Sequence, residues 1–161
     1  APLAPDYDYI LHGQGEDFQK GLDAISKLTN GKIHLNISSD QTTKVLRNSK
    51  NVQINEFSGP HPAGNPGVHI HHIAPINAGD VYWTIHAQDV ITIGRFFKEG
   101  KFDATRIVAL TGPGVENPKY YKTLIGASIK NLAKDNIKDD KEYRFISGNA
   151  LTGTQIKEDG Y

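Results

Sequence analysis

Residues 58–79, SGPHPAGNPGVHIHHIAPINAG, restrict the backbone more than any other stretch of this sequence. They contain four of the eight prolines, four glycines and four of the seven histidines. Proline fixes its own φ and restricts the residue before it, whereas glycine opens conformations that other residues avoid. We therefore predict a structural loop through Gly59, Pro60, His61, Pro62 and Gly64, followed by a short extended segment over residues 68–73.

The composition excludes several classes of protein. Lys+Arg and Asp+Glu number 18 each, so the net charge is zero, which argues against nucleic acid as a partner because such binders carry a basic face. No apolar run approaches the roughly 18 residues that span a bilayer. The absence of cysteine excludes disulfides and iron–sulfur ligation by these residues. Because methionine is also absent, we expect an excised fragment of a longer chain; an intact small protein with a processed start is the alternative.

Periodicity predicts alternating helices and strands over the first hundred residues. Phe18, Leu22, Ile25 and Leu28 recur at helical spacing, and the segments 33–37 and 52–57 alternate as strands do. We also expect a strand at 7–11, a short helix at 43–47, a strand or extended lead-in at 81–86 and a helix over 87–98. This order is typical of an α/β domain with parallel neighbouring strands, although it is too short for a complete doubly wound sheet.

The pattern changes after residue 102, where we place a domain boundary. Strands are predicted at 105–110, 120–125 and 143–146, with a helix from Ser128 to about Leu132. Two strands, a helix and a further strand within this length are typical of an α+β unit of β-grasp type. The fold class is therefore α/β plus α+β, with domains over residues 1–102 and 103–161.

The histidines invite a metal hypothesis. In an extended segment, His69 and His71 would share one face while His72 points the other way. Zinc normally requires three or four protein ligands, and no spacing supplies the others. We predict no metal site and interpret the imidazoles as donors to loop carbonyls; a zinc site with His69 and His71 as half of its ligands is the weaker alternative.

The sequence gives less support to phosphate binding, dinucleotide binding and nucleophilic catalysis. The sequence contains neither G-x-x-x-x-G-K-[ST] nor G-x-G-x-x-G, so it predicts neither a phosphate loop nor a dinucleotide loop of those types. The nucleophile elbow G-x-S-x-G is also absent, and no catalytic residue is predicted. We expect Trp83, Phe96 and Phe97 to belong to the core rather than to a cofactor stack.

Long, collinear motifs resemble those of one family. They include GLDAISKLTNGK, EFSGPHPAGNPGVHIHHIAPINAG and the segment from Trp83 to Gly94; beyond the boundary they include RIVALTGPGVENP, KTLIGASIKNL and RFISGNALTGT. From about residue 17 to 154 the chain resembles the A subunit of the sodium-translocating NADH:quinone reductase. That family is similar to the flavin subunit of respiratory complex I and to the C subunit of the Rnf complex.

The resemblance implies a partial Rossmann-like domain followed by an incomplete soluble-ligand-binding β-grasp domain. It also implies a peripheral subunit on the cytoplasmic side of a bacterial inner membrane, with the other subunits of the reductase, membrane subunits included, as partners. In this family the flavins and the iron–sulfur centre belong to other subunits, so no cofactor is expected here. The resemblance places the chain in respiratory electron transfer from NAD(H) to ubiquinone coupled to sodium transport, with the isolated fragment inactive.

Two functions remain as hypotheses. The first is a docking subunit that also contributes to a quinone pocket, where His69, His71, Tyr82 and Trp83 are the candidate contacts. Quinone sites need an apolar slot and one or two donors near the carbonyls. The alternative is a free-standing soluble module that binds a small ligand or a metal through the histidine-rich loop.

Overall fold

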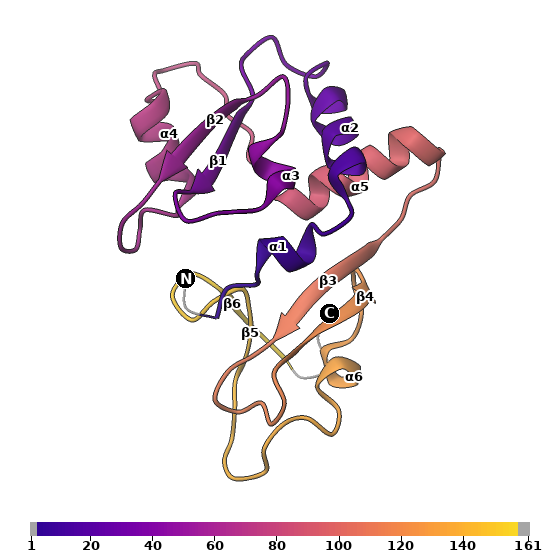
Figure 1. Cartoon of the computed structure of the whole chain (residues 1–161). Coiled ribbons are helices and arrows are strands. Elements are labelled where there is room, and N and C mark those ends of the chain that lie inside the picture. The colour runs from indigo at the N-terminus through magenta and orange to yellow at the C-terminus, as the bar shows by residue number, and fades with distance from the viewer. Residues whose placement is uncertain (1–2, 158–161) are drawn as a thin grey trace. The chain divides into compact units, whose positions relative to one another are not determined.

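The computed structural model describes residues 3–157, which form two compact units. The first unit, Tyr7–Asp103, contains most of the helix. Its elements are α1 (Tyr7–Ile10), α2 (Gly15–Ile25), β1 (His34–Ser38), α3 (Lys44–Arg47), β2 (Gln53–Phe57), α4 (Pro66–Ile73) and α5 (Ala87–Glu99) (Figure 1). The outermost residues of both predicted domains lie outside the described part of the chain.

The sheet of the first unit consists of β1 and β2, which pair in parallel as the alternation of helix and strand predicts. Leu35 lies opposite Ile54, and Asn36 lies opposite Asn55. Because side chains alternate along a strand, this register places Leu35, Ile37 and Ile54 on one face and Asn36 and Asn55 on the other, which we call the polar face. Asn55 Nδ2 lies 2.9 Å from Asn36 Oδ1 and 3.3 Å from His34 Nδ1 on the polar face.

The core of the first unit is centred on the contact of α2 with α5. Phe18 and Leu22 of α2 and Val90 and Ile91 of α5 are buried there; Ile10, Leu11, Ile37 and Leu46 complete the buried apolar set of this unit. The two predicted helices are confirmed, but Leu28 does not belong to the stripe as predicted, because α2 ends at Ile25 and Leu28 is 82% exposed.

The second unit joins residues 3–6 to 104–157 and is built from short antiparallel pairs. β3 (Thr105–Leu110) pairs with β4 (Lys119–Leu124), and β5 (Phe145–Ser147) pairs with β6 (Thr154–Ile156). α6 (Ile129–Ala133) follows β4. The sequence periodicity predicts the first three of these strands, but β6 has only three residues and no alternation that marks it.

Asn136 organises the loops of the second unit. Its side chain is almost completely buried, and it accepts from Asn117 N–H (2.9 Å) and donates to the Asn117 carbonyl (3.0 Å). A buried amide whose hydrogen bonds are satisfied holds together the two segments that it joins, because breaking either hydrogen bond would leave a buried polar group without a partner. The segment after β3 is thereby held against residues 136–138, where Lys138 N–H also donates to the Gly114 carbonyl.

Two predictions for the first unit are wrong. Tyr7–Ile10 form the helix α1 instead of a strand, and adjacent Ile10 and Leu11 are both fully buried, which the alternating faces of a strand do not allow. Residues 68–73 belong to α4, because Pro66 in its first turn is preorganised for a helix and Asn65 precedes it in extended conformation. Residues 81–86 contain no strand, which leaves the extended lead-in to α5 as the alternative that agrees with the structure.

The aromatic residues expected in the core are exposed instead. Trp83 is 93% exposed, Phe97 60% and Phe96 47%. Phe97 follows Val90 by seven residues and Gly94 by three, so it lies on the same face of α5, yet its side chain near the end of the helix is exposed. Helical periodicity therefore does not by itself tell whether a residue near the end of a helix is covered by the core.

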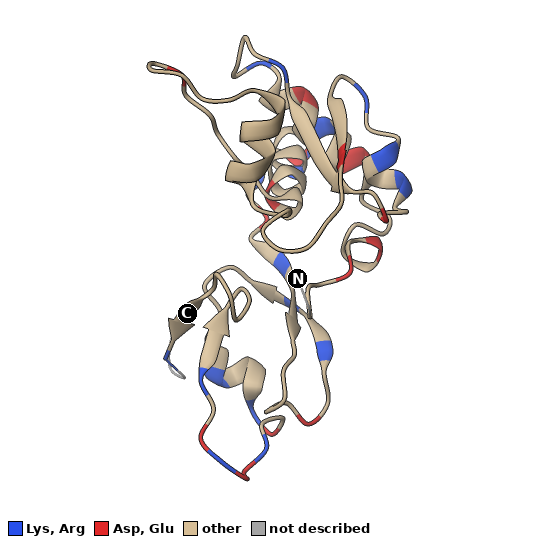
Figure 2. Cartoon of the chain, turned by 90° about the vertical axis from the view of Figure 1, so that its left-hand side faces the viewer, with Lys and Arg blue, Asp and Glu red and all other residues tan. Residues whose placement is uncertain are grey.

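Charge is mixed over both units. Positions of Lys and Arg and positions of Asp and Glu occur in both units (Figure 2), and the net charge of the sequence is zero. Within residues 3–157, no helix has both the length and the apolar character required to cross a bilayer.

Candidate functional site

The histidine-rich loop leaves the carboxyl end of β2 and enters α4 (Figure 1). Two backbone bonds hold its tight turns: Ala63 N–H donates to the Pro60 carbonyl (2.9 Å), and Asn65 N–H donates to the Pro62 carbonyl (2.8 Å). The His61–Pro62 peptide bond is cis. These two bonds describe turns at Pro60 and Pro62, and the structural role of the loop stays a prediction.

His69 connects α4 to this loop and to the sheet. Its Nε2 lies 2.8 Å from the Ala63 carbonyl oxygen, which can only accept, so Nε2 carries the hydrogen. The imidazole also packs against Phe57, with 4.1 Å between the ring centroids. Phe57 follows Asn55 by two residues and therefore lies on the same face of the sheet. His69 thus covers the end of that face.

His71 and His72 are exposed on the last turn of α4, with 5.5 Å between their ring centroids. Residues two apart on a helix do not face each other, so His69 and His71 do not form the paired half-site that a strand would give. Among the described residues, no three His, Asp or Glu side chains gather in a way that could hold a metal ion.

Tyr82 and Trp83 lie on the connection from α4 to α5, and both side chains are exposed. Among the ring contacts of residues 3–157, none involves either residue. The structure thus brings His69 together with the loop residues, but it does not bring the four candidate quinone contacts together into one pocket within this part of the chain.

A hollow of about 570 Å³ lies elsewhere, between α2 and α3. Its lining includes Lys20, Lys44 and Lys50 together with Glu16 and Asp23. Gln19 fixes one wall, because its side chain donates to the Lys50 carbonyl (3.1 Å) and accepts from Lys50 N–H (2.8 Å). The hollow is open and carries both signs of charge, and none of the predicted site residues lines it.

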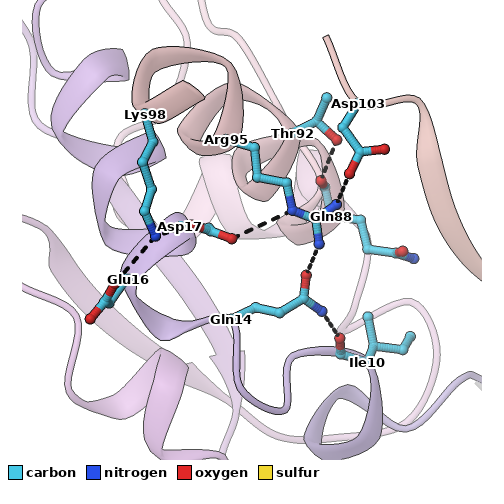
Figure 3. Close-up of polar contacts among 9 residues, drawn as sticks. All are labelled: Ile10, Gln14, Glu16, Asp17, Gln88, Thr92, Arg95, Lys98 and Asp103. Carbon is cyan, nitrogen blue, oxygen red and sulfur yellow. Dashed lines mark hydrogen bonds and ion pairs between the residues drawn. The ribbon is translucent and has the colours of Figure 1, made fainter. Parts of the chain in front are cut away.

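The most connected polar cluster of the first unit is centred on Arg95 (Figure 3). Its guanidinium contacts Asp103 (Nη1 to Oδ2, 2.7 Å), Gln14 (Nη2 to Oε1, 2.5 Å) and Asp17 (Nε to Oδ2, 3.5 Å). Gln14 in turn donates to the Ile10 carbonyl (2.5 Å). Arg95 of α5 therefore contacts α2 and the segment that follows α5 directly, and it is linked to α1 through Gln14.

Lys98 extends this cluster by one helical turn. Its ammonium lies 3.1 Å from Asp17 Oδ1 and 3.3 Å from Glu16 Oε2, and the hydrogen bond to Asp17, followed by that to Glu16, raises the pKa of Lys98. None of the partners of Arg95 was predicted from the sequence. They lie about 80 residues earlier or eight residues later, and no local pattern marks such pairs.

Two family models match this chain. One, described as the NqrA second alpha/beta domain, matches residues 1–102, and the other, described as the NQRA C-terminal domain, matches residues 107–158. The chain therefore belongs to the NqrA family, in which an α/β domain precedes a C-terminal SLBB domain.

Individual proteins of the same family also match this chain. The chain is 42% identical over 155 residues to the A subunit of the Na(+)-translocating NADH-quinone reductase of Vibrio atlanticus, and 45% identical over 153 residues to that of Vibrio alginolyticus. It is 41% identical over 152 residues to that of Neisseria meningitidis. These matches cover 94–96% of this chain but only 34% of each relative, so the chain spans about a third of the length of the curated relatives it matches.

Proposed function

We propose that residues 1–161 are a portion of the A subunit of a sodium-translocating NADH:quinone reductase and serve it as a cofactor-free docking component. The observation that carries the proposal is the collinear identity of 41–45% to proteins of that name over nearly the whole chain. The partners are then the other subunits of the complex, and the location is its cytoplasmic face at the bacterial inner membrane. Transport of sodium and reduction of quinone belong to the assembled complex.

The finer domain assignment is part of the same proposal. Residues 1–102 are the later part of a Rossmann-like domain related to the flavin subunit of complex I, and residues 103–161 belong to a soluble-ligand-binding β-grasp domain. The parallel pair β1–β2 between helices supports the first assignment, and the antiparallel pairs with α6 support the second. Kinship with flavin-binding proteins is analogy of fold, so the flavin function is not carried over.

Quinone contact is the more specific part of the proposal. His69, His71, Tyr82 and Trp83 combine imidazole and phenol donors with an exposed indole, the chemistry that a quinone headgroup needs. His71 and Trp83 are exposed, so their side chains are accessible to a ligand or to another subunit. His69 is the least available of the four because the Ala63 carbonyl occupies its Nε2.

Photo-crosslinking tests this function in the complete complex. A quinone analogue with a photoreactive group is expected to label peptides from α4 or residues 81–86, and an excess of unmodified quinone should remove the label. His71→Ala and Trp83→Ala should each reduce labelling, with the exposed Leu28→Ala as the control. Labelling confined to other subunits would refute the quinone contact and leave the docking role.

Zinc calorimetry addresses the alternative of a free-standing metal-binding module. A stoichiometric heat of binding that disappears in both His69→Ala and His71→Ala would favour that alternative. The helical placement of these residues and the bond from His69 to Ala63 lead us to expect no such heat.

A further inference from the structure

The turn that connects α2 to β1 contains a chemically reactive pair, Asn30 and Gly31, which the proposed function does not use. Asparagine is among the chemically labile residues of proteins, because its side-chain amide can be attacked by the backbone nitrogen of the next residue. A side chain on that next residue hinders the attack, and glycine has none. Asn30 is the one asparagine of the sequence that is followed by glycine.

The structure leaves this pair accessible. Asn30 and Gly31 are both exposed, and they lie outside the regular elements, because α2 ends at Ile25 and β1 begins at His34. Within residues 3–157, no hydrogen bond involves the side chain of Asn30. The side-chain amide can therefore turn towards the backbone nitrogen of Gly31 without breaking a contact of its own.

One hydrogen bond holds the attacking nitrogen. Gly31 N–H donates to Thr29 Oγ1 (3.0 Å), and both residues are exposed. A single hydrogen bond in contact with water contributes little net stability, because water replaces the partner when the bond opens. This bond therefore does not keep the nitrogen from reacting.

Other asparagines lack this combination of neighbour and exposure. Asn36 and Asn55 lie on paired strands and bind each other (2.9 Å), and Asn136 is buried. Proline, which has no backbone N–H, follows Asn65 and Asn117. The fold and the sequence thus direct the reaction to the α2–β1 turn.

We propose that Asn30 is a site of spontaneous deamidation in the folded chain. Gly31 N forms a bond to Asn30 Cγ and gives its proton to water, while the Cγ–Nδ2 bond breaks and ammonia leaves. Water then opens the five-membered succinimide at either of its two carbonyls, which leaves an aspartate or an isoaspartate at position 30. The net reaction consumes one water and releases one ammonia, and no electrons are transferred.

The modification changes the charge and the length of the turn. A carboxylate replaces a neutral amide, so the chain, whose net charge is zero, gains one negative charge. The isoaspartate product also adds one carbon to the backbone path between α2 and β1. The sheet begins after this point, where the Ile33 carbonyl accepts from Gln53 N–H (2.9 Å), so the pairing of β1 with β2 is retained.

Peptide mapping of the purified full-length protein tests the proposal. The protein is aged at mildly alkaline pH in water enriched in oxygen-18, and mass spectrometry with fragmentation assigns the label to individual asparagines. Conversion at Asn30 should be at least about 10-fold faster than at Asn48, which is also exposed but is followed by Ser49. Conversion that is no faster at Asn30 than at Asn48 would overturn the proposal.

Gly31→Ala is the matched variant. Its Cβ would lie 3.4 Å from Thr29 Oγ1, an ordinary contact, and Gly31 does not have a left-handed φ, so the turn can accept alanine. The added methyl group should slow conversion at Asn30 by at least about 10-fold. An unchanged rate would refute attack by the backbone nitrogen of residue 31.

A measurement in denaturant separates the contribution of the fold from that of the sequence. Because the turn is exposed, Asn30 in the folded protein should react within about 10-fold of its rate in the denatured chain. A slower reaction in the folded protein would overturn the proposal, because the fold would then protect the pair.

Discussion

Two glycines set the distance between α2 and α5. A Cβ atom built on Gly94 would lie 1.7 Å from the Asp17 carbonyl oxygen, and one built on Gly21 would lie 2.0 Å from that of Val90. Both are far inside van der Waals contact with backbone atoms, which cannot rotate away as a side chain can. Glycine is required here for close approach of two backbones rather than for an unusual φ.

Gly94→Ala is expected to destabilise the first unit by about 3 kcal/mol or more, because the helices must separate to admit a methyl group. Gly67→Ala in α4 is the matched control: it too replaces glycine within a helix, and its Cβ would meet nothing within 4 Å. Helix propensity alone predicts a gain of up to about 1 kcal/mol for both. Chemical denaturation followed by circular dichroism distinguishes them; equal effects would contradict the close crossing.

Tyr143 in the second unit predicts an effect of alkaline pH. Its hydroxyl donates to Asp140 Oδ1 (2.5 Å), and this bond raises the pKa of Tyr143 to about 12 and lowers the pKa of Asp140. A raised pKa in the folded state means that the bond stabilises fully below the ordinary tyrosine pKa of 10 and that this stabilisation is lost as pH rises towards 12.

Absorbance at 295 nm measures this titration. The difference between the titration of the wild-type chain and that of Tyr143→Phe should show one phenol that ionises near pH 12. Asp140→Asn should return that phenol towards its ordinary pKa. A Tyr143 that ionises near pH 10 in the wild-type chain would show that the bond is absent in solution.

At the scale of elements, α4 and the loop before it form one structural piece. Pro66 begins the helix, while His69 reaches back to the Ala63 carbonyl and packs on Phe57. The histidines of this helix are therefore not equivalent. His69 holds the loop, whereas His71 and His72 lie exposed for other contacts.

His69→Ala should lower the free energy of unfolding by about 1–2 kcal/mol, since it removes a hydrogen bond to a loop carbonyl and a ring contact. His71→Ala, on the same helix and exposed, should change it by less than about 0.5 kcal/mol. Thermal unfolding of the two variants side by side provides the measurement. An equal loss in both would mean that the bond from His69 to Ala63 contributes nothing to stability.

At the scale of the whole molecule, the proposed role is that of a component without a cofactor. The sequence lacks cysteine and the glycine-rich dinucleotide fingerprint, so it cannot ligate an iron–sulfur cluster through thiolates or form that type of flavin or NADH loop. Its proposed contribution is therefore to assembly and to the handling of quinone.

The purified chain mixed with NADH and a soluble quinone should show no loss of absorbance at 340 nm above the uncatalysed background. The complete complex under the same conditions is the positive control. Turnover by the chain alone, at a rate that scales with its concentration and survives further purification, would contradict a cofactor-free role.

Much of the fold was predictable where local periodicity and burial coincide. The stripe of Phe18 and Leu22 predicts α2, and the alternation around Leu35 and Ile54 predicts two strands whose parallel pairing follows from the helix between them. The short apolar run from Val68 to Ile73 was predicted as extended although it is helical, because helix and strand patterns cannot be distinguished over six residues. Pro66 was the signal that favoured a helix.

The sequence alone determined the family and the order of the main elements, because these depend on residues close together along the chain. Only the tertiary structure decided that His69 and His71 serve different surfaces, that Arg95 joins Gln14, Asp17 and Asp103, and that Trp83 lies exposed. Such contacts join residues far apart in sequence, and their partners are set by how the helices and the sheet pack rather than by any local pattern.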